Sequence, residues 1–328
     1  MSFLTYQEII HKIDQLEESN ILLSALQLRI FTILEKKGML AREVSQKARI
    51  TYEGSEVLLN ALAAMGALKK RGNKFKNTPE TYKHFSESSP HYKKGTVMLK
   101  KENRDEFAAL NTIIQKGRDL TAFDGGDDPK FRELFTHAMH ERSTLYAEKV
   151  ARVVARKSVG RLIDLGCGPG SYSAAILKKD RKATATLLDR PAAIKVARQI
   201  HKGSPVFKRF KFIRGDLHEK DFGEGYDTVL LSNVLHIYNP CENQFLFKKI
   251  HRALNLGKRF ILYDLFLKDN QTEPYDAALF ALTMLLFTKT GKSYTYRETE
   301  TMMRSAGFRG FKRFEVGYGT SLIEGIKK

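Results

Sequence analysis

The sequence predicts an α/β protein, with a doubly wound parallel sheet in the C-terminal half and a smaller helical domain before it. From residue 161 onward, short apolar runs alternate with helical patterns, which is typical of a sheet covered by helices. A glycine-rich turn follows the first of these runs, where open α/β sheets bind nucleotides. About ninety residues before this region carry apolar side chains at helical spacing.

Residues 1–95 are expected to form the helical domain, with a shape like a winged helix. Helical patterns cover residues 9–34, 40–48 and 53–65, and residues 69–78 have the pattern of two short strands around a Gly-Asn turn. The succession of helix, turn, helix and β-wing predicts this shape.

The wing supports two interpretations. Its tip, residues 69–76, is basic, as a wing that contacts DNA phosphates would be. The preceding helix carries Glu53, Glu56 and Asn60 but no arginine on its polar face, whereas a recognition helix usually brings basic or amide side chains to the bases. We therefore favour a scaffold and dimerisation domain.

Residues 96–328 are expected to form the second domain. Within it, residues 96–156 supply connecting helices that line the substrate pocket. Periodicity predicts helices over 97–115 and 129–156, and the glycines and aspartates of 121–128 predict a loop between them. The second of these helices leads directly into the sheet.

Seven strands are expected in the sheet. They cover residues 161–165, 183–188, 210–213, 226–231, 259–263, 310–316 and 321–326. Helical patterns separate the first five strands, and a further helix is expected over 295–306. The last two strands have only residues 317–319 between them, so they form a hairpin and one of them must run antiparallel.

The turn after the first strand reads Asp164-Leu165-Gly166-Cys167-Gly168-Pro169-Gly170. A dinucleotide fingerprint would place its third glycine one residue later, and the acid before the first glycine would repel a pyrophosphate. That acid suits a ligand with a cationic amino group. The pattern resembles motif I of the class I S-adenosylmethionine (SAM) methyltransferases. The resemblance implies SAM as cofactor and S-adenosylhomocysteine as product, bound by Asp164, Gly166, Cys167 and Gly168.

Two later strand ends carry acids that suit a nucleoside. Asp189, beside Arg190, can accept hydrogen bonds from ribose hydroxyls, or it can cap the helix that follows. Asp216 follows the third strand and could face the adenine, with Leu217 packed on the ring. The alternative for Asp216 is an ordinary turn aspartate.

The fourth strand ends in Ser232 and Asn233, which we also expect at the cofactor, and His236 follows them. The ordinary pKa of histidine suits a general base near neutral pH. Asp264 ends the neighbouring fifth strand, where a carboxylate would fix the imidazole tautomer. A lone histidine is more often a surface residue or a satisfied core residue, but its place at this edge favours catalysis.

An apolar pocket for the substrate is expected from aromatic and methionine side chains at helical spacing. Its members are Phe131, Phe135, Met139, Phe280, Met284 and Phe287. Ordinary core packing or a dimer contact would produce the same spacing.

Taken together, these segments resemble the two-domain, SAM-dependent small-molecule O-methyltransferases, which include plant phenolic and bacterial antibiotic and pigment enzymes. The similar segments are 25–68, 135–139, 233–236, 257–264 and 305–308. The resemblance implies a homodimer and methyl transfer to a hydroxyl oxygen of a small, largely apolar acceptor, such as an aromatic, quinone, polyketide or pigment. It also implies that His236 is the base and that Asp264 supports it.

Three positions depart from that family. Ile237 and Tyr238 stand where the family often has Asp and Trp, and Ser293 stands where its plant members carry a second glutamate. These departures leave open methylation of carbon, a reaction other than methyl transfer, or a regulatory role.

The formal net charge of +19 would suit nucleic acid or an anionic membrane, or it can be a lysine-rich solvated surface. Basic residues are spread along the chain, so we favour the ordinary surface and expect neither a membrane nor a nucleic-acid partner. A nucleic-acid methyltransferase is the weaker alternative, because Asn239-Pro240 is followed by Cys241 and no base-flipping motif is completed.

The chain has two cysteines, Cys167 and Cys241, which provide neither a disulfide framework nor a metal site. Its first 20 residues show no signal-peptide pattern, and the longest apolar stretch, 277–287, is too short to span a bilayer. We therefore expect a cytoplasmic protein that holds no metal.

Overall fold

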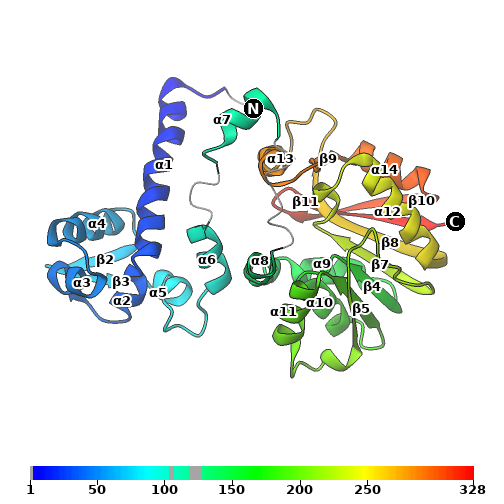
Figure 1. The fold of residues 1–328 in the computed structure, drawn as a ribbon, viewed down its shortest axis with the longest axis horizontal. Coiled ribbons are helices and arrows are strands. Elements are labelled where there is room, and N and C mark those ends of the chain that lie inside the picture. The colour runs from blue at the N-terminus through cyan, green and yellow to red at the C-terminus, as the bar shows by residue number, and fades with distance from the viewer. Residues whose placement is uncertain (1–2, 103–106, 119–127) are drawn as a thin grey trace. The chain divides into compact units, whose positions relative to one another are not determined.

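The computed structural model describes residues 3–102, 107–118 and 128–328, and the chain divides into two compact units, Met1–Asp105 and Glu106–Lys328 (Figure 1). Each unit is described by itself. Most of the loop expected over 121–128 lies outside the described residues, as does the middle of the helix expected over 97–115. The ends of that expected helix belong to α6 (Lys94–Glu102) in the first unit and α7 (Leu110–Lys116) in the second.

The first unit has the expected winged-helix shape. Its helices are α1 (Tyr6–Gln27), α2 (Ile30–Leu34), α3 (Ala41–Ala48), α4 (Tyr52–Ala64), α5 (Pro79–Phe85) and α6. Strands β2 (Leu68–Arg71) and β3 (Lys74–Asn77) form the wing, and β1 (Met39–Leu40), which sequence analysis missed, pairs with β3. The expected pattern over 9–34 is two helices, because Arg29 adopts a left-handed conformation (φ 57°) between α1 and α2.

The second unit contains the mixed sheet. Its strands are β4 (Arg161–Leu165), β5 (Thr184–Asp189), β6 (Phe210–Arg214), β7 (Tyr226–Ser232), β8 (Leu254–Leu267), β10 (Phe308–Gly317) and β11 (Thr320–Lys327), in the order β10-β11-β8-β7-β4-β5-β6. Strands β4 to β8 are parallel to one another, and β11 is antiparallel to both β8 and β10. The expected hairpin is confirmed, and a two-residue strand, β9 (Tyr294–Thr295), also pairs with β8.

Helices cover both faces of this sheet (Figure 1). They are α8 (Pro129–Ser143), α9 (Ala147–Val154), α10 (Ser171–Lys179), α11 (Pro191–His201), α12 (Pro240–Ala253), α13 (Tyr275–Phe287) and α14 (Tyr296–Ser305). Successive residues of a strand point to opposite faces of the sheet and pack in different hydrophobic cores. Leu162 packs with residues of α9, α10 and α11, whereas Ile163 packs with residues of α12 and α14. This alternation explains the continuous apolar runs that predicted buried parallel strands.

The helix expected over 129–156 is two helices, α8 and α9. The hydroxyl of Ser143 donates to the carbonyl of His140, and that of Thr144 donates to the carbonyl of Glu141. Such side-chain bonds compete with the helical backbone bonds and favour a helix end. The break places Tyr146 against Tyr318, with ring centroids 5.8 Å apart.

A buried carboxylate joins α9 to the sheet. Glu324 on β11 is 1% exposed and pairs with Arg259 on β8 at 3.3 Å and with Arg156 at 2.8 Å. The Arg259 guanidinium also donates to the carbonyl of Val154 at the end of α9. Within the part of the chain that the structure describes, no helix has the length and apolar character needed to cross a membrane.

Candidate functional site

The residues predicted to bind the cofactor lie at one edge of the sheet, where the parallel strands have their carboxyl ends. Leu165 at the end of β4 pairs with Leu188 of β5 and Leu231 of β7, and Ser232 pairs with Tyr263 of β8. The loops that follow these strands are therefore neighbours, although their sequences lie far apart. This edge is where open α/β sheets bind their ligands.

The turn after β4 has three glycines with positive φ, and only one of them is open to space. A Cβ at Gly166 (φ 67°) would lie 2.6 Å from Val234, and one at Gly170 (φ 67°) would lie 2.8 Å from Leu187. A Cβ at Gly168 (φ 50°) would meet nothing within 4 Å. Gly166 and Gly170 are thus needed because the backbone passes close to core side chains, and Gly168 leaves room for a ligand. The side chain of Cys167 is buried in the core, so only its backbone is available to a cofactor.

Asp164 has an unusual environment for a carboxylate. The residue is 0% exposed; its Oδ2 accepts from the hydroxyl of Ser173 at 2.6 Å, and its Oδ1 has no hydrogen-bond partner among the residues described. Burial raises the pKa of Asp164 to about 7. A buried carboxylate oxygen without a partner calls for a donor, and the α-ammonium group of SAM would be one. The residues present therefore fit this cofactor.

Asp189 is held by the backbone. One of its carboxylate oxygens accepts from the N–H of Gly168 and the other from the N–H of Arg190, each at 2.7 Å. Burial raises the pKa of Asp189. The N-cap of α11 is Arg190, so Asp189 is not that cap, and its remaining lone pairs can accept from ribose hydroxyls.

Asp216 forms an ion pair with Arg190 at 2.6 Å and accepts from the N–H of His218 at 2.6 Å. Leu217 beside it is buried. The ion pair brings together two loops that sequence analysis assigned to the cofactor. A lysine that sequence analysis missed supports the second loop: Lys249 donates to the carbonyls of Leu217 and His218 at 2.7 and 2.9 Å.

Asn233 adopts a left-handed conformation (φ 55°) directly after the buried Ser232, and its N–H donates to the carbonyl of Tyr263. The side chain of Asn233 lies near the hydroxyl of Tyr172, and the ring of Tyr172 packs on that of Tyr263 with 5.3 Å between ring centroids. Sequence analysis missed Tyr172, although its place directly after the glycine turn was a usable signal.

His236 and Asp264 form a buried pair. His236 lies in a short 3-10 helix, Leu235–Ile237, and its Nδ1 is 2.7 Å from Oδ1 of Asp264. The same oxygen accepts from the N–H of Leu265, and Asp264 is 1% exposed. An ionised carboxylate can only accept here, so Nδ1 is the donor, and in the neutral form of the imidazole Nε2 has a free lone pair.

The loop between α13 and β9 packs against the backbone of this histidine. A Cβ at Gly291 would lie 2.1 Å from the carbonyl oxygen of His236. Arg118 donates to the carbonyls of Lys289 and Gly291, at 3.1 and 2.8 Å. Ser293, in place of the glutamate of plant enzymes, is buried, and its hydroxyl lies 3.5 Å from the carbonyl of Ala277. Sequence analysis missed the roles of Arg118 and Gly291 because both contacts are non-local.

The residues predicted to line the substrate pocket lie on two helices. Phe131, Phe135 and Met139 are half-buried on α8, where the two rings stack at 5.9 Å. On α13, the ring of Phe280 packs edge-on against the imidazole of His236, with 4.8 Å between the ring centroids. Met284 is buried, and the ring of Phe287 packs edge-on against that of Phe107, with 6.4 Å between the ring centroids. The contacts thus bring Phe280 directly to the base.

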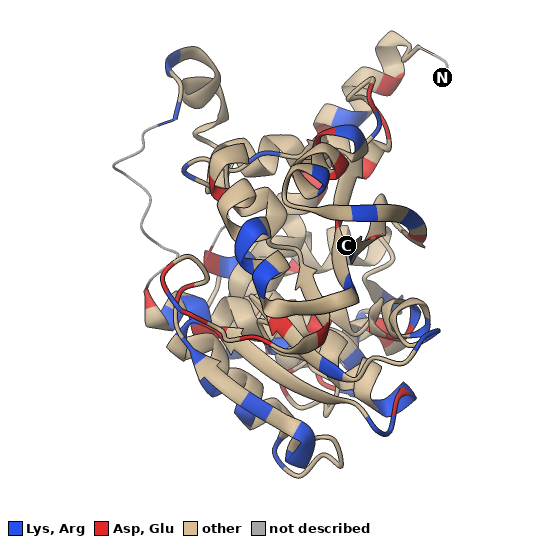
Figure 2. Cartoon of the chain, turned by 90° about the vertical axis from the view of Figure 1, so that its right-hand side faces the viewer, with Lys and Arg blue, Asp and Glu red and all other residues tan. Residues whose placement is uncertain are grey.

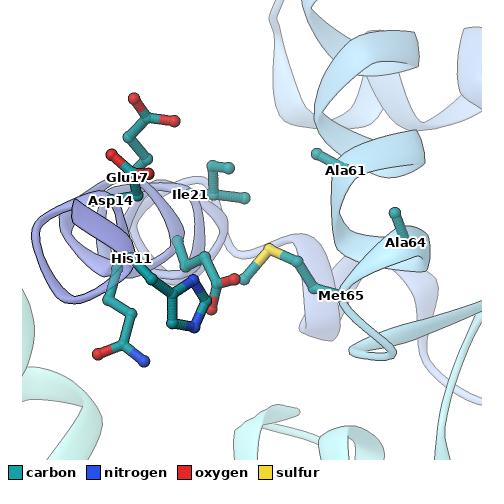
Figure 3. Close-up of a pocket in the computed structure, with 9 residues that line it drawn as sticks. His11, Asp14, Glu17, Ile21, Ala61, Ala64 and Met65 are labelled. Atoms are coloured by element: carbon teal, nitrogen blue, oxygen red, sulfur yellow. The ribbon is translucent and has the colours of Figure 1, made fainter. Parts of the chain in front are cut away.

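A separate hollow lies in the first unit. Figure 3 shows side chains of α1, among them His11, Asp14 and Ile21, beside Ala61 of α4 and Met65, which follows that helix. Its volume is about 270 Å³. Its acidic wall contains none of the residues that sequence analysis assigned to a site.

The sheet order, the glycine turn and the acids at the strand ends define a class I SAM methyltransferase. A family model described as the O-methyltransferase domain matches residues 104–309, and one described as the O-methyltransferase dimerisation domain matches residues 10–87. The chain belongs to this family of SAM-dependent O-methyltransferases, and its cofactor is SAM.

Several individual relatives are distant but similar over more than nine tenths of their length. The 3-hydroxy-5-methyl-1-naphthoate 3-O-methyltransferase of Streptomyces sahachiroi is 25% identical, over 93% of this chain and 91% of that protein. An N,N-dimethyltransferase, OxyT of Streptomyces rimosus, is 25% identical over the same shares. Human N-acetylserotonin methyltransferase in complex with SAM has the same fold, with a TM-score of 0.86 at 21% identity, over 99% of this chain and 98% of that one.

Proposed function

We propose that this enzyme methylates a hydroxyl oxygen of a small aromatic acceptor, with His236 as the general base. The observation that carries this proposal is the buried bond of 2.7 Å between His236 and Asp264, at the sheet edge that holds the cofactor residues. Asp264 keeps the proton on Nδ1, so Nε2 can take the hydroxyl proton of the acceptor. The carboxylate then stabilises the imidazolium that results.

When bound, SAM supplies a methyl group already activated on a sulfonium. The remaining tasks are to orient the acceptor and to exclude water. We assign the α-ammonium to Asp164, the ribose to Asp189, and the adenine to Asp216 and Leu217. Backbone groups of Gly166, Cys167 and Gly168, with Arg190, Ser232 and Asn233, complete the proposed cofactor site.

The acceptor is proposed to be aromatic and largely apolar. Phe280 lies edge-on to the base, and the other lining residues assigned to the pocket, on α8 and α13, are aromatic or methionine. Aromatic rings pack well in offset or edge-on arrangements against one another. The name of the relative that methylates a hydroxynaphthoate is consistent with this class, which includes phenols, quinones, polyketides and pigments.

The test uses SAM with an isotopically labelled methyl group and a panel of hydroxynaphthoates and matched aminonaphthoates, analysed by mass spectrometry. We expect label on oxygen for the hydroxyl compounds and a fall in kcat of about 10²–10⁴-fold in His236→Ala, with SAM affinity unchanged. If His236→Ala turned over at the wild-type rate, His236 would not be the general base. Label on the amines alone would favour nitrogen as the acceptor atom.

A second function is methylation of nitrogen or carbon. Two observations favour it: Ser293 replaces a carboxylate of the plant enzymes, and a relative of equal identity is an N,N-dimethyltransferase. An amine attacks through its neutral form, so it needs less help from a base. In that case His236→Ala would retain most of its turnover on the aminonaphthoates.

We further propose a homodimer formed through the first unit. Helix α1 buries only Ala25, and the large apolar side chains exposed on it include Ile9, Ile13 and Leu16. An apolar patch of this kind marks a protein interface. Light scattering should show a dimer for the wild type and a monomer for the double variant Ile13→Glu, Leu16→Glu. A wild-type monomer would overturn the proposal.

A further inference from the structure

Basic residues occur along the whole chain, but more than half of its net positive charge lies in one segment of the second unit. Residues 178–214 contain 12 of the 56 Lys and Arg residues but only two of the 37 Asp and Glu residues. The segment therefore carries +10 of the net +19, within 37 of 328 residues. Figure 2 shows Lys and Arg on many elements of the chain, so the concentration becomes clear only when charge is counted by segment.

The fold gathers these residues at one place. The guanidinium of Arg209 donates to the carbonyls of Leu177, Asp180 and Ala183, which ties the start of β6 to the loop after α10. Arg198 of α11 lies over the ring of Phe212 on β6, 5.0 Å from its centroid. The end of α10, the outer side of α11 and the start of β6 therefore form one surface.

We call this the basic surface and define it by six exposed side chains: Lys178, Arg181, Lys182, Lys202, Lys208 and Lys211. None of the six forms an ion pair with any residue in the described ranges. The nearest acid in sequence, Asp180, is already engaged, because its carboxylate accepts from the N–H groups of Val159 and Lys182. Within the described part of the chain, these six cations thus have no ion-pair partner.

The basic surface lies at the edge opposite the cofactor residues. Lys182 precedes β5, and Lys208 and Lys211 lie at the start of β6, whereas Asp189 ends β5. Charge at this place can therefore not serve the cofactor. Strand β6 lies at the edge of the sheet, and a lysine there, such as Lys211, hinders pairing with a strand of another molecule. That role does not explain the basic residues on α10, α11 and the loops.

The composition of this surface selects the kind of partner. Among the residues described, the large apolar side chains that are exposed include none between Leu145 and Ile237. A stable protein interface has an apolar core, and stable attachment to a membrane adds inserted apolar side chains or a lipid anchor to a basic patch. Lysines on flexible stems, by contrast, bind phosphates as point charges.

In contrast to the expectation from the sequence, which favoured an ordinary solvated surface and no nucleic-acid partner, we propose that the basic surface binds the phosphate backbone of nucleic acid, without regard to base sequence. The partner is a carrier or scaffold for the enzyme and not a methyl acceptor, because the surface lies at the other end of the strands from His236. The nearby rings are not available for stacking on bases, because Phe207, Phe210 and Phe212 pack on one another. Affinity must then come from phosphate contacts and fall steeply with salt.

The test measures fluorescence anisotropy of a labelled 20-base-pair DNA duplex over a series of salt concentrations. For six phosphate contacts, the logarithm of the association constant should fall with the logarithm of salt with a slope of about −5. The surface variant is K202Q/K208Q/K211Q. The matched control, K248Q/K312Q/K328Q, removes three exposed lysines of the same unit that also lack a described ion pair.

The surface variant should lose about three units of slope and roughly a hundredfold in affinity at 0.1 M salt. The control should change affinity by less than about threefold, since its lysines are not predicted to contact phosphate. Calorimetry with SAM verifies that both variants are folded. This readout also separates the proposal from methyl transfer, on which it does not depend.

Three results would overturn it. One is no binding by the wild type at about 50 mM salt, where phosphate contacts are strong. The second is an equal loss in the two triple variants, which would mean that net charge alone acts. The third is equal or tighter binding to phosphatidylserine vesicles or to polyglutamate, which would assign the surface to a membrane or to an acidic protein.

Discussion

The two halves of the candidate site are held in different ways. In the cofactor half, acids at the ends of β4 and β5 are bonded to backbone N–H groups or to a neighbouring hydroxyl. In the acceptor half, the imidazole of His236 is held by one carboxylate and by an aromatic ring, and the backbone of His236 packs against a distant loop. Backbone groups fix the first half, whereas side-chain packing fixes the second. Mutations in one half should therefore change SAM affinity, and mutations in the other half should change the rate of methyl transfer.

The largest separation is expected from Asp264→Asn. The amide can donate to Nδ1, which would place the proton on Nε2 and remove the acceptor lone pair. We expect kcat to fall by about 10³–10⁴-fold, as for the wrong tautomer in other histidine-based sites. Calorimetric SAM affinity should stay within about threefold of the wild type, because Asp264 is not assigned to the cofactor. A loss of affinity that matches the loss of kcat would show that the two halves are one unit.

A matched pair of glycine variants tests the cofactor half. Gly168→Ala places a Cβ in open space, so it should fold but lose SAM affinity by more than tenfold, since the ligand would need that space. Gly170→Ala meets Leu187 at 2.8 Å, so it should mainly lower the melting temperature. Both alanines bear the strain of a left-handed conformation, about 1–2 kcal/mol. Equal SAM affinities in the two variants would contradict the assignment of the open space at Gly168 to the cofactor.

A smaller effect is expected in the acceptor half from Arg118→Lys. Lysine can reach one of the two carbonyls that the guanidinium now bridges, so the loop against His236 should loosen. We expect kcat to fall about three- to tenfold, equivalent to roughly 1 kcal/mol, with no change in the KM for SAM. A rise in that KM with kcat unchanged would place Arg118 in the cofactor half.

The sequence predicted the cofactor half better than the acceptor half, for a physical reason. The bounds of β4 were right to the residue, and α10 follows the glycine turn where a helical pattern was expected, because an apolar strand, a glycine turn and a helix are local patterns. The contact of Gly291 with the backbone of His236 joins residues that are 55 positions apart, and no periodicity records it. Nor does periodicity show that α8 ends at Ser143, where the hydroxyls of Ser143 and Thr144 donate to backbone carbonyls.

Binding of SAM also bears on stability, through Asp164. Its pKa is raised by burial from 3.8 to about 7, so the folded protein binds a proton that the unfolded chain releases. The stability that this proton confers is present below about pH 4 and is lost as the pH rises towards 7. SAM, by offering its ammonium to the ionised carboxylate, should raise the melting temperature more at pH 8 than at pH 6. Asp164→Asn should remove this difference.

The most direct test of the account is isothermal titration of SAM into the wild type and Asp164→Asn between pH 5.5 and 8.5. Only the ionised carboxylate can pair with the ammonium, so wild-type affinity should weaken by up to about tenfold per pH unit as the pH falls below 7. The asparagine variant should bind more weakly and with little dependence on pH. No heat from SAM, or equal affinity and pH dependence in the two proteins, would contradict the claim that this strand edge holds the cofactor through Asp164.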